Sequence, residues 1–349
     1  MRALTGIVLM STLTLACQGQ GLFERFKNRP EATTALVLGY RGQFEFRGFG
    51  SGALYFVPLD TNAQNRLVAV VTAKHNLADK ETGVPFDGLL IKVNAARGRK
   101  PLYVKLPLKH DEPRNYWISP SGFDFAVIPL PPQLVSGADV VSFSEDQIVT
   151  PENSDDLQIT PGLIVQALCM QPEYMDALDF LMPETLPALR IGHLSRLGFY
   201  RTPDGARLVR PHVIDMHSSP GNSGATVLVL VPKPDQSLTQ PMFLGIVQGF
   251  PEETGSYIPY KAPLTNLTSE STSMLLVSAE RAETNQVALT FKTVANPDLT
   301  TVIPVHELVG IRASPAFASA AFIMSTNQKL YETLDALPVP NKEDAQPAH

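Results

Sequence analysis

The chain has 349 residues, of which 28 are basic and 34 acidic, so its formal net charge is -6, and only 18% of its residues are charged. This composition excludes a disordered chain and a basic nucleic-acid-binding protein. Thirty prolines and 23 glycines divide the apolar segments into short runs, which excludes a helical bundle or coiled coil and indicates an all-β protein.

The N-terminal segment is typical of an export signal. Residues 3–16 are apolar and follow Arg2, but this stretch is shorter than the roughly 20 residues of a membrane-spanning helix. We therefore predict a signal peptide over residues 1–17 and an exported protein of the bacterial periplasm, outer surface or extracellular space. Cys17 resembles the lipidated cysteine of bacterial lipoproteins, so a lipid anchor there is one outcome of processing and simple cleavage of the signal is the other.

Residues 18–34 are polar, without apolar periodicity, and are predicted to be a linker. A first series of β-rich segments follows within residues 35–135, separated by Gly, Pro, Asn and Asp. The segments are residues 36–38, 44–46, 53–57, 67–71, 89–93, 103–106 and 125–130. Such a series fits one closed or nearly closed barrel.

Residues 131–161 form a Pro-rich and acidic crossing, after which a second series of strands is predicted within residues 160–312. Its segments are residues 163–168, 190–194, 207–214, 225–231, 243–247, 287–291 and 300–305. Two packed antiparallel β-barrels are the simplest interpretation. A polar insert covers residues 251–285, and a C-terminal extension, residues 313–349, carries one predicted short helix.

The candidate nucleophile is Ser223, which lies in the turn Ser-Pro-Gly-Asn-Ser-Gly before an apolar strand. Glycines on both sides permit positive φ angles and leave backbone N–H groups uncovered. A hydroxyl presented there would lie beside donors able to bind an oxyanion, which suits acyl transfer. A serine in an ordinary Gly-Asn turn is the structural alternative.

A serine hydroxyl needs a neighbouring base, and that base needs an orienting carboxylate. His75 ends an apolar run at a barrel rim, whereas His110 and His349 have the context of solvated surface residues. Asp124 stands at the start of a buried strand, where a charge requires a partner. Taken singly, both His75 and Asp124 also fit structural roles.

Together, His75, Asp124 and Ser223 resemble the trypsin-like serine proteases of the chymotrypsin fold, particularly the bacterial secreted and HtrA-like members without a PDZ domain. Their His–Asp–Ser order is that of this fold. Further segments agree with the resemblance, which spans about residues 35–312: residues 50–54, 190–195, 244–247 and 302–305.

The resemblance implies a serine endopeptidase acting on protein or peptide substrates. His75 would be the general base and acid, Asp124 its orienting partner and Ser223 the nucleophile, with the amides of Gly221 and Ser223 as the oxyanion hole. The substrate backbone would pair with Gln248, Gly249 and Phe250. By this resemblance, His217 occupies the position at the base of the primary specificity pocket, with Ser218 beside it. A histidine there disfavours cleavage after Lys or Arg.

The main alternative is a catalytically inactive binding protein on the same fold. No His-Glu-x-x-His segment is present and the histidines are scattered, so neither a metal nor another cofactor is expected. We expect no nucleic-acid partner, and the sequence leaves the oligomeric state open.

Overall fold

The structure is a computed structural model. It describes residues 33–42, 45–58, 66–80, 82–93, 102–131, 142–170, 188–202, 205, 207–219, 221–232, 239–249, 254–256, 274–281, 287–293, 298–326 and 331–334. The predicted signal peptide, Cys17 and Phe250 lie outside these residues. No helix within the described ranges has the length and apolar character needed to cross a membrane.

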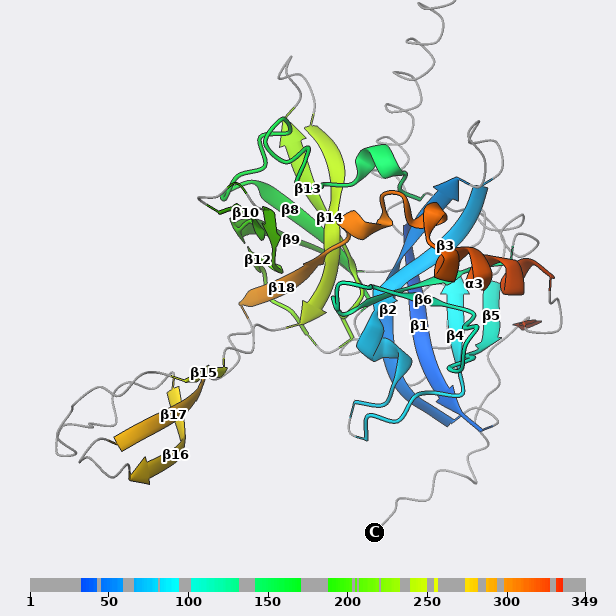
Figure 1. The fold of residues 1–349 in the computed structure, drawn as a ribbon, viewed down its shortest axis with the longest axis horizontal. Coiled ribbons are helices and arrows are strands. Elements are labelled where there is room, and N and C mark those ends of the chain that lie inside the picture. Colours follow the sequence, from blue (N-terminus) through cyan, green and yellow to red (C-terminus); the bar gives the residue numbers. More distant parts are fainter. Residues whose placement is uncertain are drawn as a thin grey trace, which may run out of the picture.

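Strands from the first half of the chain, together with β19 from near the C-terminus, form an eight-stranded sheet with the strand order β19-β5-β4-β1-β2-β3-β7-β6. Its strands are β1 (Thr34–Arg41), β2 (Glu45–Pro58), β3 (Arg66–Ala73), β4 (Gly88–Val93), β5 (Leu102–Pro107), β6 (Trp117–Ile118), β7 (Phe125–Pro129) and β19 (Glu332–Leu334). The ribbon in Figure 1 curls strands β1 to β5, in blue and cyan, into a half-barrel. The half-barrel stays open because β6 and β19 are not joined to each other.

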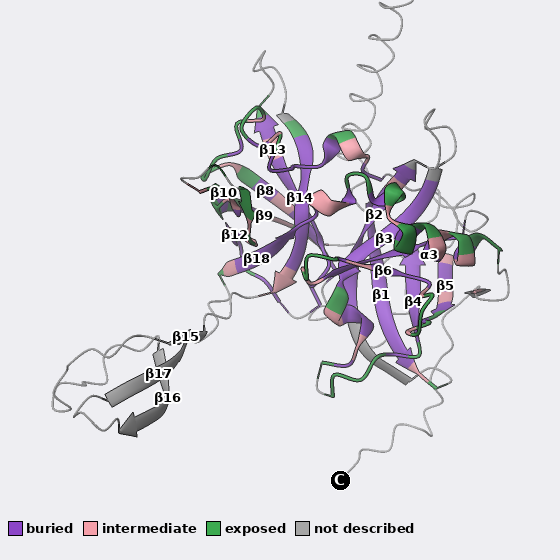
Figure 2. Ribbon diagram, in the orientation of Figure 1, coloured by how far each residue is buried: buried purple, intermediate pink, exposed green. Residues whose placement is uncertain are grey.

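The second half forms a closed barrel with the order β12-β18-β14-β13-β8-β9. Its strands are β8 (Ile164–Cys169), β9 (Ala188–Arg196), β12 (His212–Asp215), β13 (Thr226–Pro232), β14 (Thr239–Gly249) and β18 (Leu299–Pro304). The prediction of an all-β double-barrel fold with a short C-terminal helix is therefore confirmed. In Figure 2 the strands of both barrels are mostly buried.

Three details of the predicted strands are wrong. The separate segments 44–46 and 53–57 belong to one continuous strand, β2, which begins at Glu45. The segment 207–214 is broken into β11 (Arg207–Val209) and β12, because Pro211 lacks the N–H that a continuous ladder requires. The segment 287–291 does not join the second barrel. It lies in β17 (Val287–Thr293), which pairs with β15 (Thr254–Ser256) and β16 (Met274–Arg281) in a separate three-stranded sheet.

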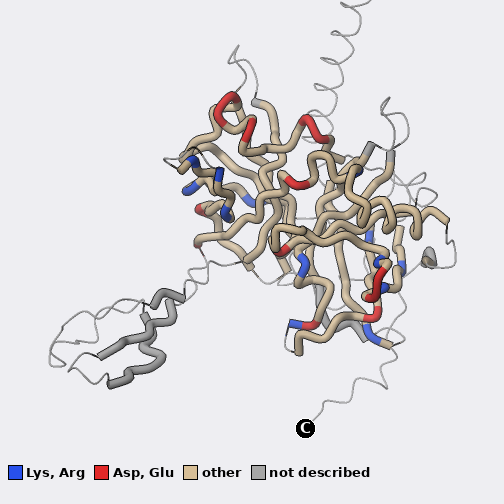
Figure 3. Tube along the Cα trace, viewed as in Figure 1, with Lys and Arg blue, Asp and Glu red and all other residues tan. Residues whose placement is uncertain are grey.

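Strand β11 pairs with β10 (Phe199–Arg201) in a small hairpin that carries two arginines, Arg201 and Arg207. Figure 3 shows basic positions at this edge of the second barrel. Both arginines are in ion pairs, Arg201 with Asp155 at 2.9 Å and Arg207 with Glu152 at 2.5 Å. Part of this local basic charge is therefore neutralised within the fold.

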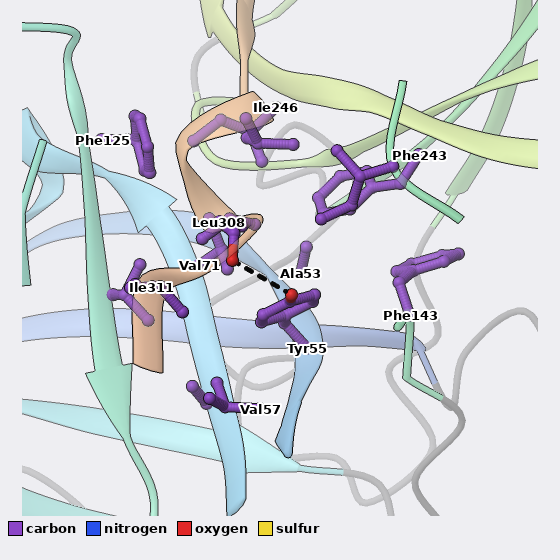
Figure 4. Packing of buried hydrophobic residues seen from close by; sticks show 14 of the residues in the cluster. Ala53, Tyr55, Val57, Val71, Phe125, Phe143, Phe243, Ile246, Leu308 and Ile311 are labelled. Carbon is purple, nitrogen blue, oxygen red and sulfur yellow. Dashed lines mark hydrogen bonds between the residues drawn. The ribbon is translucent and has the colours of Figure 1, made fainter. Parts of the chain in front are cut away.

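The two barrels share an apolar core (Figure 4). Phe143, in the crossing between the halves, stacks on Phe243 of β14 with ring centroids 4.8 Å apart. Tyr55 of β2 donates its hydroxyl to the Leu308 carbonyl oxygen at 3.3 Å. After Leu308, the helix α3 (Pro315–Thr326) places Phe317 in the same core. Segments from the whole length of the chain thus hold the barrels against each other.

Candidate active site

Ser223 lies in the second of two consecutive tight turns that share Asn222. The Asn222 N–H donates to the Ser219 carbonyl oxygen at 3.1 Å, and the Ala225 N–H donates to the Asn222 carbonyl oxygen at 2.8 Å. The third residue of each turn is a glycine with positive φ, +88° at Gly221 and +85° at Gly224. This conformation favours glycine. The sequence therefore folds locally so that Ser223 stands in a turn three residues before β13 begins at Thr226, and Ser223 is 6% exposed.

His75 lies in the single turn η2 (Lys74–Leu77) directly after β3. Its Nδ1 is 2.5 Å from Asp124 Oδ2, and its backbone N–H donates to Asp124 Oδ1 at 3.0 Å. The Lys74 N–H also donates to the Asp124 carbonyl oxygen, so the turn and the start of β7 are joined by three hydrogen bonds. The two side chains are 27% and 26% exposed. This arrangement leaves Nε2 as the free end of the imidazole.

The turn of Ser223 is joined to the first barrel beside His75. Asn76, the next residue after His75, donates its side-chain amide to the Ser223 carbonyl oxygen at 2.9 Å. The Ser51 N–H donates to the same oxygen at 2.8 Å. The structure therefore brings the segments of all three predicted residues, His75, Asp124 and Ser223, to one place between the barrels.

The Ser223 hydroxyl donates to the Gln248 carbonyl oxygen at 3.0 Å. Among the described residues, the buried Nε2 of His75 has no hydrogen-bond partner. The serine–imidazole hydrogen bond is therefore not formed in this conformation. A rotation about the Ser223 side-chain bond would change the acceptor of its hydroxyl.

Gln248 lies at a shift in register of β14, between Val247, which pairs with Val302, and Gly249, which pairs with Thr301. The pairing of β14 with β13 extends to Ile246, whereas that with β18 continues to Gly249. On its other side, Val247 is still bonded to the backbone of Gly224 and Ala225, so only the end beyond Val247 is bonded as a strand on one side alone. An extended peptide would add to the other side by backbone hydrogen bonds.

The backbone N–H groups of Gly221 and Ser223 have no acceptor among the described residues. The Gly221 carbonyl oxygen accepts the Ser51 hydroxyl at 3.2 Å. Their predicted role as oxyanion-hole donors stays a prediction.

His217 is half-exposed, and its Nδ1 lies 3.6 Å from Asp298 Oδ1. The adjacent Met216 N–H donates to the Asp298 carbonyl oxygen at 2.9 Å, which holds the two segments side by side. Ser218 is 2% exposed. No hydrogen bond or ion pair between described residues joins His217 to Ser223. The predicted role of His217 in a pocket stays a prediction.

Sequence reasoning missed two polar residues of the site, Ser51 and Asn76. Both are buried, and both contact the turn of Ser223. Their positions in the sequence, inside Gly-Ser-Gly and directly after His75, were the available signal. The prediction that His110 is a solvated surface residue was wrong. Its ring nitrogens lie 2.9 Å from the Tyr116 hydroxyl and 2.7 Å from the Phe86 carbonyl oxygen.

Two titratable groups near the barrel walls are held neutral by burial. Burial raises the pKa of the Cys169 thiol to about 12, which opposes formation of a thiolate nucleophile. Burial, followed by the proximity of His306, lowers the pKa of His212 to about 3. In the part of the chain that the structure describes, no cluster of His, Cys, Asp or Glu has the arrangement of a metal site.

No protein-family model matches the chain, and no curated protein matches it in sequence. Among solved structures it is similar to the MamO protease domain of Magnetospirillum magneticum in its apo form, at 14% identity over 76% of this chain and 92% of that one, with a TM-score of 0.35. A protease of M. tuberculosis in its active form has 12% identity, coverage of 81% and 80%, and a TM-score of 0.38. A Glu endopeptidase in complex with MPD has 10% identity, coverage of 83% and 92%, and a TM-score of 0.41.

Proposed function

We propose that the protein is a trypsin-like serine endopeptidase that hydrolyses peptide bonds through His75, Asp124 and Ser223. The observation that carries the proposal is the meeting of two contacts at one place. His75 is paired with Asp124 through Nδ1 at 2.5 Å, and its neighbour Asn76 is bonded to the backbone of Ser223 at 2.9 Å. A base held by a carboxylate beside a serine on a glycine turn is the arrangement that acyl transfer requires.

In the acylation step, Ser223 Oγ attacks the carbonyl carbon of the substrate while its proton passes to His75 Nε2. The new oxyanion accepts hydrogen bonds from the N–H groups of Gly221 and Ser223. The C–N bond then breaks, and His75 gives the proton to the leaving amine. Water next attacks the acyl-enzyme, losing its proton to His75, and the proton returns to Ser223 Oγ as the acid leaves. Asp124 stabilises the imidazolium in both steps.

Protein or peptide chains are the substrates that this geometry accommodates. The end of β14, including Gln248 and Gly249, is bonded on one side to β18, so an extended chain would add as a further strand there. His217, at the position expected for the base of the primary pocket, lies with its Nδ1 3.6 Å from Asp298 Oδ1.

A second candidate is a binding protein on the protease fold, without activity. The observation that favours it is the direction of the Ser223 hydroxyl, which donates to the Gln248 carbonyl oxygen instead of His75 Nε2. In the enzyme, this hydroxyl rotates to the imidazole when substrate is bound. In the binding protein it stays on Gln248.

Labelling with a fluorophosphonate probe separates the two candidates. The reaction joins phosphorus to Ser223 Oγ, releases fluoride and passes the hydroxyl proton through His75 to solvent. We expect labelling of the wild type, loss of labelling in Ser223→Ala, and wild-type labelling in Ser154→Ala. Ser154 is a matched control because it is also buried, at 3% exposed, and bonds to the Pro151 carbonyl oxygen. A folded wild type that stays unlabelled and cleaves no member of a peptide library would refute the enzyme.

A further inference from the structure

We infer that Asn76 and Ser51 are positioning residues for the nucleophile: they fix the backbone on both sides of Ser223 from the opposite barrel. This inference rests on the proposed function and adds two residues to it. Neither side chain is assigned to the reacting atoms. Their role is to set the direction of the Ser223 N–H and of the Ser223 side chain.

Asn76 uses both hydrogens of its amide group. Its Nδ2 donates to the Ser223 carbonyl oxygen at 2.9 Å and to Thr72 Oγ1 at 3.0 Å. Because Thr72 is held in β3 of the first barrel, the amide cannot rotate without losing one of these bonds. The side chain is 8% exposed, so water does not replace a lost partner readily.

Ser51 holds the same turn at two points. Its N–H donates to the Ser223 carbonyl oxygen at 2.8 Å, and its hydroxyl donates to the Gly221 carbonyl oxygen at 3.2 Å. The Met170 N–H donates to this hydroxyl at 2.9 Å, which leaves the hydroxyl hydrogen for Gly221. The Ser51 carbonyl oxygen accepts the Thr72 hydroxyl at 2.7 Å.

These contacts close a ring of hydrogen bonds between the barrels. It runs from Ser223 to Asn76, Thr72, Ser51 and back to Ser223. Only a close approach of the two backbones permits such a ring. A Cβ at Gly224 would overlap the Ser51 carbonyl oxygen.

The first barrel also needs a residue without a Cβ at this contact, at Gly50. A Cβ at Gly50 would overlap the side-chain amide of Asn76. Glycine at position 50 therefore leaves the space in which Asn76 reaches the nucleophile turn.

The ring fixes the peptide groups before and after the one that carries the Ser223 N–H. The carbonyl of Gly221 is bonded to Ser51, and the carbonyl of Ser223 is bonded to Ser51 and Asn76. The peptide between them has its own carbonyl, that of Asn222, bonded to the Ala225 N–H. Three consecutive peptide groups are thus oriented, so the Ser223 N–H keeps a fixed direction as an oxyanion donor.

The test is the substitution Asn76→Ala, with Asn115→Ala as the matched control. Asn115 is also buried, and its side chain bonds the Pro107 carbonyl oxygen at 2.8 Å and the Lys109 N–H at 2.9 Å, away from Ser223. Peptide hydrolysis is measured on the full processed chain and expressed per serine titrated by an acylating reagent. A purely structural role would change the amount of titratable serine and leave the turnover of each site unchanged.

We expect Asn76→Ala to lower kcat per titrated site by about 10²-fold, with KM within about twofold of the wild type. In Asn115→Ala, kcat per titrated site should stay within about twofold. If Asn76→Ala does not fold, Asn76→Asp keeps the shape without the donor and should show the same loss. Unchanged kcat in a folded Asn76 variant would overturn the positioning role alone. A wild type that neither labels nor turns over would overturn the proposed function and this role with it.

Discussion

Acid should destabilise the fold through His212, and substitution of this residue should remove part of that effect. His212 opens β12 and has no exposed surface. Its Nδ1 accepts the Gly198 N–H at 2.8 Å, and the Phe199 ring lies edge-on at 4.8 Å between centroids. Its pKa is lowered to about 3, first by burial and then by His306.

The sign and size follow from proton binding in the two states. In the unfolded chain a histidine binds a proton below about pH 6.5, whereas native His212 stays neutral until the pH approaches its own pKa of about 3. The unfolded state therefore binds more protons between these values, and the free energy of unfolding falls as the pH falls. At pH 5 the difference of about 1.5 pH units from the unfolded pKa corresponds to about 2 kcal/mol.

The groups around His306 modify this pH dependence. The pKa of His306 is also lowered, chiefly by burial, while Glu307 and Glu152 oppose that shift. His306 therefore adds to the loss of stability in acid, and it remains in any variant of His212. The comparison between wild type and variant isolates the part that belongs to His212.

The assay is urea unfolding at pH 7 and pH 5 of the wild type and of His212→Asn, whose side-chain oxygen can accept the Gly198 N–H. We expect the decrease in unfolding free energy between the two pH values to be about 2 kcal/mol smaller in the variant. The exposed His193 on β9 gives the control, because His193→Asn should keep the wild-type decrease. An equal decrease in His212→Asn and wild type would refute the reasoning.

Two further predictions concern the contact between the barrels. Gly224→Ala should abolish labelling of Ser223 and destabilise the fold by more than about 2 kcal/mol. The reason is that φ is +85° at Gly224 and a Cβ there would overlap the Ser51 carbonyl oxygen. The control Gly205→Ala, where φ is +84° but the space is open, should lower the free energy of unfolding by only about 1 kcal/mol. Phe143→Ala should lower the unfolding free energy by about 3–5 kcal/mol, because it removes the ring that stacks on Phe243 and leaves a cavity in its place. The same substitution at Phe322, which is 67% exposed, should change it by less than about 0.5 kcal/mol. Urea unfolding measures both pairs, and equal losses within a pair would contradict the respective prediction.

The double-barrel fold was predictable because each strand is a short apolar run bounded by turn residues. Apolar pattern identifies a strand without identifying its partners. That limit explains why β17 was assigned to the wrong sheet, and why β19, near the C-terminus, was not expected beside β5. Pairing between residues such as Glu332 and Lys105 depends on the folded arrangement of the whole chain.

The candidate site was predictable to the extent that its chemistry is local. The glycines around Ser223 and the charge of Asp124 at the start of β7 are visible in the sequence itself. The roles of Ser51 and Asn76 depend on contacts across 172 and 147 positions of the chain, from residue 51 to 223 and from 76 to 223. Serine and asparagine are common in loops and turns for other reasons, so residue type alone does not reveal such contacts.

Two kinds of contact join the barrels, and they should fail in different ways. The apolar contact of Phe143 with Phe243 is non-directional, so it stabilises the association without fixing the angle of any peptide group. The hydrogen bonds of Ser51 and Asn76 to the Ser223 carbonyl oxygen are directional, so they set that angle while each contributes little net stability. Loss of the apolar contact should therefore reduce the folded fraction and leave the turnover of each folded molecule intact. Loss of the polar contacts should lower the turnover of each folded molecule more than it lowers the folded fraction, so stability and turnover respond differently to changes at the same interface.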